Sequence, residues 1–168
     1  FTTFCVLIII NGTNFIDGSN ILALGYFLIL ELAFINLNLK GLNFDGVIFA
    51  NNFFLFLLIL ISFNIVNKLY LGDGGSYLLG FIYSFKCISF YLSNLNVSPF
   101  FIIVLLWYPA FEILFSILRK YNFNKSPIKP DSNHLHQLIY FLLLKKVSNN
   151  IFKSNLVGII INIFNLSI

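Results

Sequence analysis

Long apolar segments separated by short polar connectors are the feature that most constrains this chain. A helix needs about 20 apolar residues to cross a bilayer, and in lipid a helix satisfies its own backbone hydrogen bonds. Only 10% of the residues are charged, against roughly 25% in soluble domains. The sequence therefore predicts an all-α, polytopic integral membrane helix bundle of about five to six transmembrane helices. The expected apolar segments are 1–10, 21–39, 47–66, 77–95, 99–118 and 155–168.

The ends of the chain predict a single membrane domain over residues 1–168 that is incomplete at its N-terminus. Phe1 is not an initiator Met, and the apolar stretch 1–10 is half the length of a span. It also lacks the basic start and the small-residue cleavage site of a signal peptide. Cys5 and Cys87 both lie in apolar segments, which argues against a disulfide framework or a zinc site.

The connectors divide the charges unevenly between the two membrane faces. If each segment crosses once, connectors 11–20, 67–76 and 119–154 share one face, and connector 40–46 lies on the other. The shared face carries eight of the ten basic residues, which are Lys68, Arg119, Lys120, Lys125, Lys129, Lys145, Lys146 and Lys153. Positive charge marks the cytoplasmic side. The same face collects Asp17, Asp73, Asp131, His134 and His136, so we expect an active site built from cytoplasmic loops.

The first polar motif is Asn11, Asn14 and Asp17, followed by Gly18. A spacing of three residues places these oxygen-bearing side chains on one stripe of a helix. Such a stripe at a helix end suits Mg²⁺ or a nucleotide. Helix capping and a turn explain the same residues, and on this motif alone that interpretation is favoured.

The second motif sets an acid among glycines, at residues 71–76. Asp73 is a candidate ligand for Mg²⁺, while the amides of Gly74, Gly75 and Ser76 at the start of the next helix would face phosphate. The alternative is a tight turn in which Ser76 caps that helix. Both interpretations stay open on this segment alone.

The third motif runs from Lys129 to Gln137 and contains Asn133, His134 and His136. Two residues apart, the histidines would diverge on a helix and share a face in an extended turn. Imidazoles beside a lysine suit a diphosphate. A solvated basic loop that binds lipid head groups explains the composition as well.

Three ionisable residues fall inside the apolar segments, namely Glu31, Lys86 and Glu112. Such residues are expensive in hydrocarbon and are candidates for function. Glu31 and Lys86 lie near segment ends, and we expect them to pair or snorkel in a structural role. Glu112 follows Pro109 and precedes the basic pair Arg119–Lys120, a possible salt-bridge partner, and its role is open.

Four motifs in this order resemble those of the polyprenyl-phosphate N-acetylhexosamine-1-phosphate transferases (glycosyltransferase family 4), which include the phospho-MurNAc-pentapeptide transferases. Residues 11–18 resemble the family's N-x-x-N-x-x-D-G, and residues 72–81 its G-D-x-G-S-x-x-L-G-F. Pro109 with Glu112 and a basic pair is similar to P-x-x-D/E, and residues 130–136 to P-D-x-N-H-L-H. Asn20 and Gln137 depart from the pattern, and the family's upstream Asp-Asp motif is absent, so we expect this chain alone to be inactive.

The resemblance implies transfer of N-acetylhexosamine-1-phosphate from a UDP-sugar to undecaprenyl phosphate, with release of UMP, at the start of cell-wall or surface glycan synthesis, lipopolysaccharide included. It implies Mg²⁺, or Mn²⁺, held by Asp73 and Asn14, with Asp73, Asp17, His134 and His136 as the catalytic residues. Binding of the substrates falls to Asn11, Asn14, Gly74, Ser76, Lys129 and Asn133. The implied location is the bacterial inner membrane, multi-pass, with the site facing the cytoplasm.

The expected partners are the two substrates and the lipid bilayer, with a homodimer possible and no nucleic acid. Two other classes of protein fit parts of the sequence. One is a transporter subunit in which Glu31, Lys86 and Glu112 line a path. The other is a truncated, inactive family member that acts as a scaffold. The clustering of acids and histidines on one face favours the enzyme.

Overall fold

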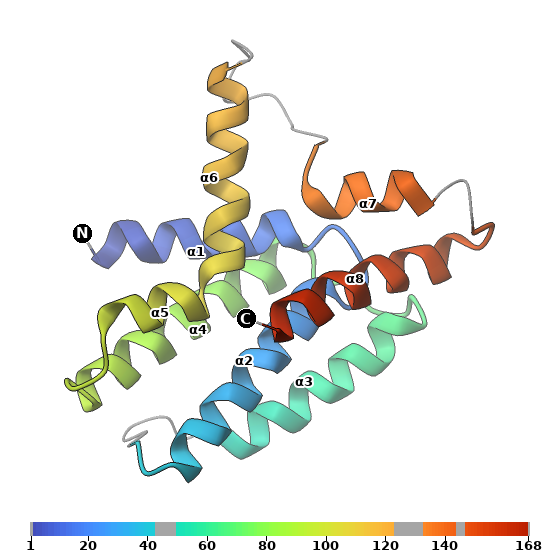
Figure 1. Ribbon diagram of the computed structural model, residues 1–168. Coiled ribbons are helices and arrows are strands. Elements are labelled where there is room, and N and C mark those ends of the chain that lie inside the picture. Colours follow the sequence, from blue (N-terminus) through green and yellow to red (C-terminus); the bar gives the residue numbers. More distant parts are fainter. Residues whose placement is uncertain (1, 43–49, 123–132, 144–146, 168) are drawn as a thin grey trace.

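The computed structural model describes residues 2–42, 50–122, 133–143 and 147–167 (Figure 1). Within these ranges the chain forms eight α-helices and no strand, so the predicted all-α class is confirmed. The helices are α1 (Thr2–Ile16), α2 (Leu22–Leu39), α3 (Ala50–Ile65), α4 (Gly72–Ser93), α5 (Pro99–Leu105), α6 (Trp107–Asn122), α7 (Leu135–Leu143) and α8 (Asn150–Leu166).

Helix α1 packs against α4 on one side and α6 on the other. Helix α2 packs against α3 and α8, and α7 packs against α8. Figure 1 shows α6 projecting away from the other helices, which lie across its base. As a result, the C-terminal end of α1 lies close to the start of α4 and to the segment that leads into α7.

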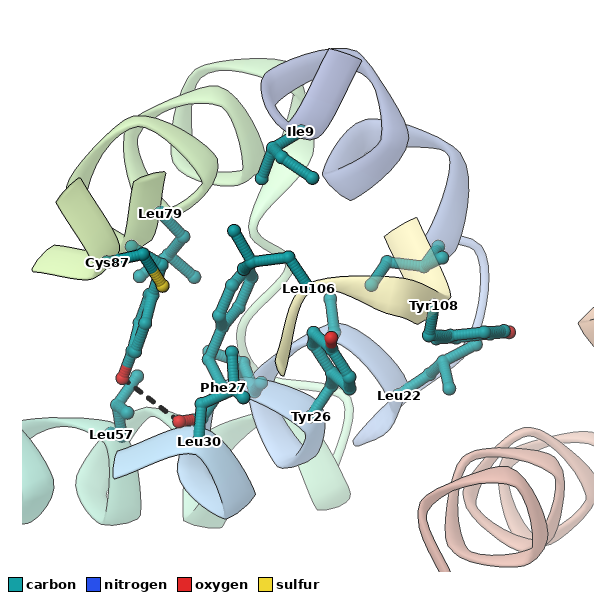
Figure 2. Packing of buried hydrophobic residues seen from close by; sticks show 14 of the residues in the cluster. Ile9, Leu22, Tyr26, Phe27, Leu30, Leu57, Leu79, Cys87, Leu106 and Tyr108 are labelled. Atoms are coloured by element: carbon teal, nitrogen blue, oxygen red, sulfur yellow. Dashed lines mark hydrogen bonds between the residues drawn. The ribbon is translucent and has the colours of Figure 1, made fainter. Parts of the chain in front are cut away.

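The core lies where α1, α2, α3, α4, α8 and the start of α6 meet (Figure 2). Aromatic side chains fill much of it, and the rings of Phe27 and Tyr83 stack with centroids 4.4 Å apart. Large apolar side chains also lie on the outside: Leu78, Phe81 and Phe85 of α4 are each more than half exposed. An apolar exterior of this extent suits a lipid environment.

One described helix, α2, is long and apolar enough to cross a membrane, and it matches the expected segment 21–39. Helices α5 and α6 together meet the same criteria, but they are bent by 76° at their junction. A total of one or two such helices is consistent with a membrane protein, while the expected five to six spans stay a prediction.

The expected segment 99–118 is not one straight helix, because the chain bends by 76° at Leu106, between α5 and α6. Pro109 explains the break. It has no N–H to donate to the carbonyl of Leu105 four residues earlier. That carbonyl accepts a hydrogen bond from the hydroxyl of Tyr26 instead, at 2.6 Å. Pro109 is therefore accommodated in the first turn of a new helix.

Glu31 and Lys86 form a buried ion pair between α2 and α4. The ammonium of Lys86 donates to both carboxylate oxygens, at 2.7 and 2.6 Å, and the Tyr83 hydroxyl donates to one of them at 2.8 Å. The ammonium also lies 4.8 Å from the centroid of the Phe53 ring. The expectation that these two residues pair is confirmed.

Candidate active site

The end of α1 and the start of α4 meet through polar side chains. The amide nitrogen of Asn14 donates to a carboxylate oxygen of Asp73 at 2.8 Å and to the hydroxyl of Ser76 at 3.1 Å. These residues are about 60 positions apart in the sequence, so the fold brings two of the predicted motifs together.

Asp17 lies just after α1 and faces the same junction. Its carboxylate accepts a hydrogen bond from the backbone N–H of Gly72. Burial, followed by the negative charge of Asp73, raises the pKa of Asp17 to about 7, although the Gly72 N–H opposes the shift. Two carboxylates held near one another repel, and a cation between them would relieve that repulsion.

Helix α4 begins at Gly72, which has a φ of 60°. A glycine adopts this left-handed conformation without steric cost. The interpretation of Ser76 as an N-cap is wrong, because Ser76 lies within the helix and its hydroxyl donates to the carbonyl of Asp73 at 3.1 Å. Gly74 is exposed in the first turn, with open space beside it.

His134 and His136 share a face at the start of α7. Their rings are parallel, with centroids 5.8 Å apart, and the ring of His134 also lies 5.0 Å from that of Phe15. His136 packs so closely on Gly18 that a Cβ there would lie 2.1 Å from its Nε2. The third motif therefore joins the end of α1, as the one-sided distribution of acids and histidines predicted.

Burial, together with neighbouring His134, lowers the pKa of His136 to about 4, although Glu112 opposes the shift. The imidazole is therefore neutral at pH 7. Its Nδ1 is buried and has no hydrogen-bond partner within the described part of the chain. A neutral ring with an unsatisfied nitrogen can accept from or donate to a bound ligand.

The remaining predicted residues lie in different settings. The amide of Asn11 donates to the carbonyl of Leu7 at 2.7 Å, on an exposed part of α1, rather than to the residues at the α1–α4 junction. Asn133 is exposed just before His134. Lys129 lies outside the described residues.

Comparison with known proteins finds a match to a protein family. The family model described as glycosyl transferase family 4 matches residues 1–91, just over half of the chain. The chain belongs to glycosyl transferase family 4. Both the Asn14–Asp17 motif and the Asp73 motif lie inside the matched region, so the resemblance drawn from the sequence is confirmed at the level of the family.

Over 71 residues the chain is 35% identical to the undecaprenyl-phosphate alpha-N-acetylglucosaminyl 1-phosphate transferase of Thermotoga maritima. The match covers 42% of this chain and 23% of that relative, so the chain spans about a quarter of the relative's length. No solved structure matches the chain. Glycosyl transferase family 4 is a family of membrane enzymes, which agrees with the apolar exterior of the helices.

The sequence did not reveal which residues the carboxylate of Glu112 contacts. This carboxylate lies 3.1 Å from Nδ1 of His134 and accepts from the N–H of Leu135 at 3.2 Å. The spacing to Arg119 and Lys120 on the same helix suggested a partner there. The helical break at Pro109 and the position of α7 bring it to the histidine motif instead.

A polar pocket of about 290 Å³ adjoins Asp17 and Gly72. Three asparagine residues to which the motifs gave no role line it. Asn20 donates to Asn67, and Asn64 accepts from the N–H of Ile21 at 2.6 Å. Of the three, only Asn20 stood out in the sequence, because the family pattern has an acid at that position.

The donor set at the α1–α4 junction fits a magnesium ion. Proteins commonly bind Mg²⁺ through one or two carboxylates together with substrate phosphates, and Asp17 and Asp73 supply two carboxylates. No group of three or more His, Cys, Asp or Glu residues suited to a metal occurs within the described ranges. Within the described ranges, these residues therefore do not form a metal site made of protein ligands alone.

The contact between Gly18 and His136 leads to a test in the complete protein. In Gly18→Ala the added methyl would overlap the imidazole, so the ring or the loop must move. We expect turnover per folded protein to fall about 10- to 100-fold, as when a supporting contact of a site is lost. The measurement is UMP release normalised to folded protein.

Gly80→Ala is the matched control for this test. There the added methyl meets Cα of Ile10 and Oγ1 of Thr13, both at 2.8 Å, in the packing of α1 on α4. We expect Gly80→Ala to lower thermal stability and to reduce turnover per folded protein much less than Gly18→Ala does. Equal turnover in the two variants would contradict a role for the position of His136.

Proposed function

We propose that the protein transfers N-acetylhexosamine-1-phosphate from a UDP-sugar to undecaprenyl phosphate and releases UMP. The observation that carries this proposal is the convergence of Asn14, Asp17 and Asp73 with the paired histidines. Three segments far apart in the sequence supply these groups, and each belongs to a motif of the resemblance. The name of the Thermotoga maritima relative, which contains undecaprenyl phosphate and N-acetylglucosaminyl 1-phosphate, supports the choice of substrates.

The chemistry asks mainly for positioning and for neutralisation of charge. An oxygen of the lipid phosphate attacks the phosphorus that carries the sugar. The bond from that phosphorus to the bridging oxygen breaks, and the bridging oxygen leaves with UMP. A phosphate monoester has its second pKa near 6, so the nucleophile is already largely an oxyanion at pH 7 and needs little help from a base.

Asp73 and Asn14 are the residues proposed to hold Mg²⁺, or Mn²⁺, with the carboxylate of Asp17 beside them. A bound divalent ion would offset the charge of the diphosphate. In the structure Asn14 turns its amide nitrogen to Asp73, so its part as a ligand would require the amide to rotate. Without that rotation it orients the carboxylate of Asp73.

The histidines are proposed to hold the diphosphate, together with Lys129 and Asn133. Ser76 is buried beneath Asp73 and orders the first turn of α4, and the N-terminal end of this helix is proposed to face an anion. The polar pocket next to Asp17 suits the nucleotide end of the donor, because asparagine amides both donate and accept. Tyr70 at its rim is 68% exposed and offers a face for a base.

A membrane setting follows from the lipid substrate. We propose a multi-pass location in the bacterial inner membrane, with the site on the cytoplasmic side, where the positive connectors are expected. The exposed apolar side chains of α4 and α6 provide surfaces along which an isoprenoid chain can lie. The homodimer stays a prediction.

The test uses the complete protein in liposomes that contain undecaprenyl phosphate. We expect release of UMP that requires a UDP-N-acetylhexosamine, the lipid phosphate and a divalent cation together. Transport of the sugar nucleotide without its cleavage would favour the transporter class instead. A folded protein that neither cleaves nor transports would support the scaffold.

A further inference from the structure

Glu112 is a buried carboxylate that contacts the histidine segment through both of its oxygens. Only 2% of its surface is exposed. One oxygen lies 3.1 Å from Nδ1 of His134, and the other accepts from the backbone N–H of Leu135 at 3.2 Å. Because a buried charge is costly without such partners, this carboxylate is committed to the start of α7.

The pairing determines where His134 carries its proton. An ionised carboxylate only accepts hydrogen bonds, so Nδ1 must donate. Nε2 is then the ring nitrogen that remains for substrate. A third contact restrains the segment, because the N–H of His134 donates to the side-chain oxygen of Gln137 at 3.1 Å. The ring is also held against Phe15, next to Asn14 in the sequence.

We propose that Glu112 is a positioning residue, which fixes the proton of His134 on Nδ1 and so directs Nε2 to the diphosphate of the donor. This inference rests on the proposed function. When the ring carries both protons, Nε2–H donates to a phosphate oxygen, and the carboxylate of Glu112 balances the charge behind it. The arrangement parallels the way a carboxylate orients a histidine in other active sites.

A purely structural role for Glu112 makes different predictions. If the carboxylate only anchored α7, its loss would reduce the amount of folded protein and leave the KM for both substrates unchanged. It would also act independently of His134. A positioning role predicts that removing the carboxylate lowers kcat/KM for the nucleotide sugar. It also predicts that the same removal has little effect in a variant that already lacks His134.

The kinetic test compares Glu112→Gln, His134→Gln and the double variant in the complete protein, with UMP release normalised to folded protein. We expect Glu112→Gln to lower kcat/KM for the UDP-sugar about 10- to 100-fold and to leave KM for the lipid phosphate unchanged. In the His134→Gln background the same change should add little, which is the signature of coupled residues. Equal losses in both backgrounds would overturn the proposal.

A second readout does not depend on turnover. Ring ¹⁵N resonances of His134, assigned by their loss in His134→Gln, should show a protonated Nδ1 in the wild type. They should change in Glu112→Gln, because an amide can also donate to Nδ1. Unchanged resonances would overturn the proposal. A wild-type protein that shows the Nδ1 proton but releases no UMP would instead contradict the proposed function.

Glu112→Asp covers the case in which Glu112→Gln does not accumulate. The shorter side chain keeps the acceptor, so we expect Nδ1 to stay protonated and kcat/KM to fall less than in His134→Gln. A loss as large as that of His134→Gln, with wild-type ring resonances, would contradict the positioning role.

Discussion

Asp73→Asn in the complete protein is expected to reduce UMP release about 10²- to 10³-fold, while the protein still inserts into the membrane. Losses of this order accompany removal of a group that stabilises charge in a transition state. The change keeps the size of the side chain and removes its charge. Because Asp73 is exposed, its loss leaves no cavity in the core. Added Mg²⁺ or Mn²⁺ should not restore turnover.

Asp45→Asn is the matched control, since Asp45 lies in connector 40–46, which the sequence places on the opposite membrane face. We expect this variant to turn over like the wild type. A second comparison is Asn14→Ala, which removes the hydrogen bond to Asp73 and should cost less than Asp73→Asn. Wild-type turnover by Asp73→Asn, with or without added metal, would exclude the proposed metal role.

The meeting of Asn14, Asp17 and Asp73 was predictable from the sequence. If the spans alternate in direction, every second connector lies on the same membrane face. Polar side chains in those connectors are then close to one another at that face. The same argument brought the histidines to that face. Their shared orientation was not predictable, because it depends on His134 standing just before α7 and His136 inside it.

The partner of Glu112 was beyond the sequence for a physical reason. Sequence spacing relates residues only along their own helix, and Arg119 and Lys120 lie about two turns beyond Glu112 on the same one. The actual partner, His134, is 22 residues away on another element. Its approach depends on the bend of 76° at Leu106, and hydropathy carries no information on such bends.

Lys86→Met is expected to destabilise the protein by about 3–5 kcal/mol, the usual cost of removing one partner of a buried ion pair. Glu31 would then remain 1% exposed with the hydroxyl of Tyr83 as its described hydrogen-bond donor. A single hydroxyl does not replace an ammonium that contacts both carboxylate oxygens. The half-life of the folded protein in detergent measures the effect.

The double variant Glu31→Leu with Lys86→Met should recover much of this loss, because it leaves no unpaired charge. Lys40→Met, at the exposed end of α2, is the control for loss of a lysine. Residue 86 is 13 positions beyond Asp73 on α4, or roughly 20 Å along the helix, so the double variant should keep its turnover per folded protein. A stable Lys86→Met would mean that the pair does not fix α2 to α4. Loss of turnover in a stable double variant would mean that the pair serves the chemistry rather than the fold.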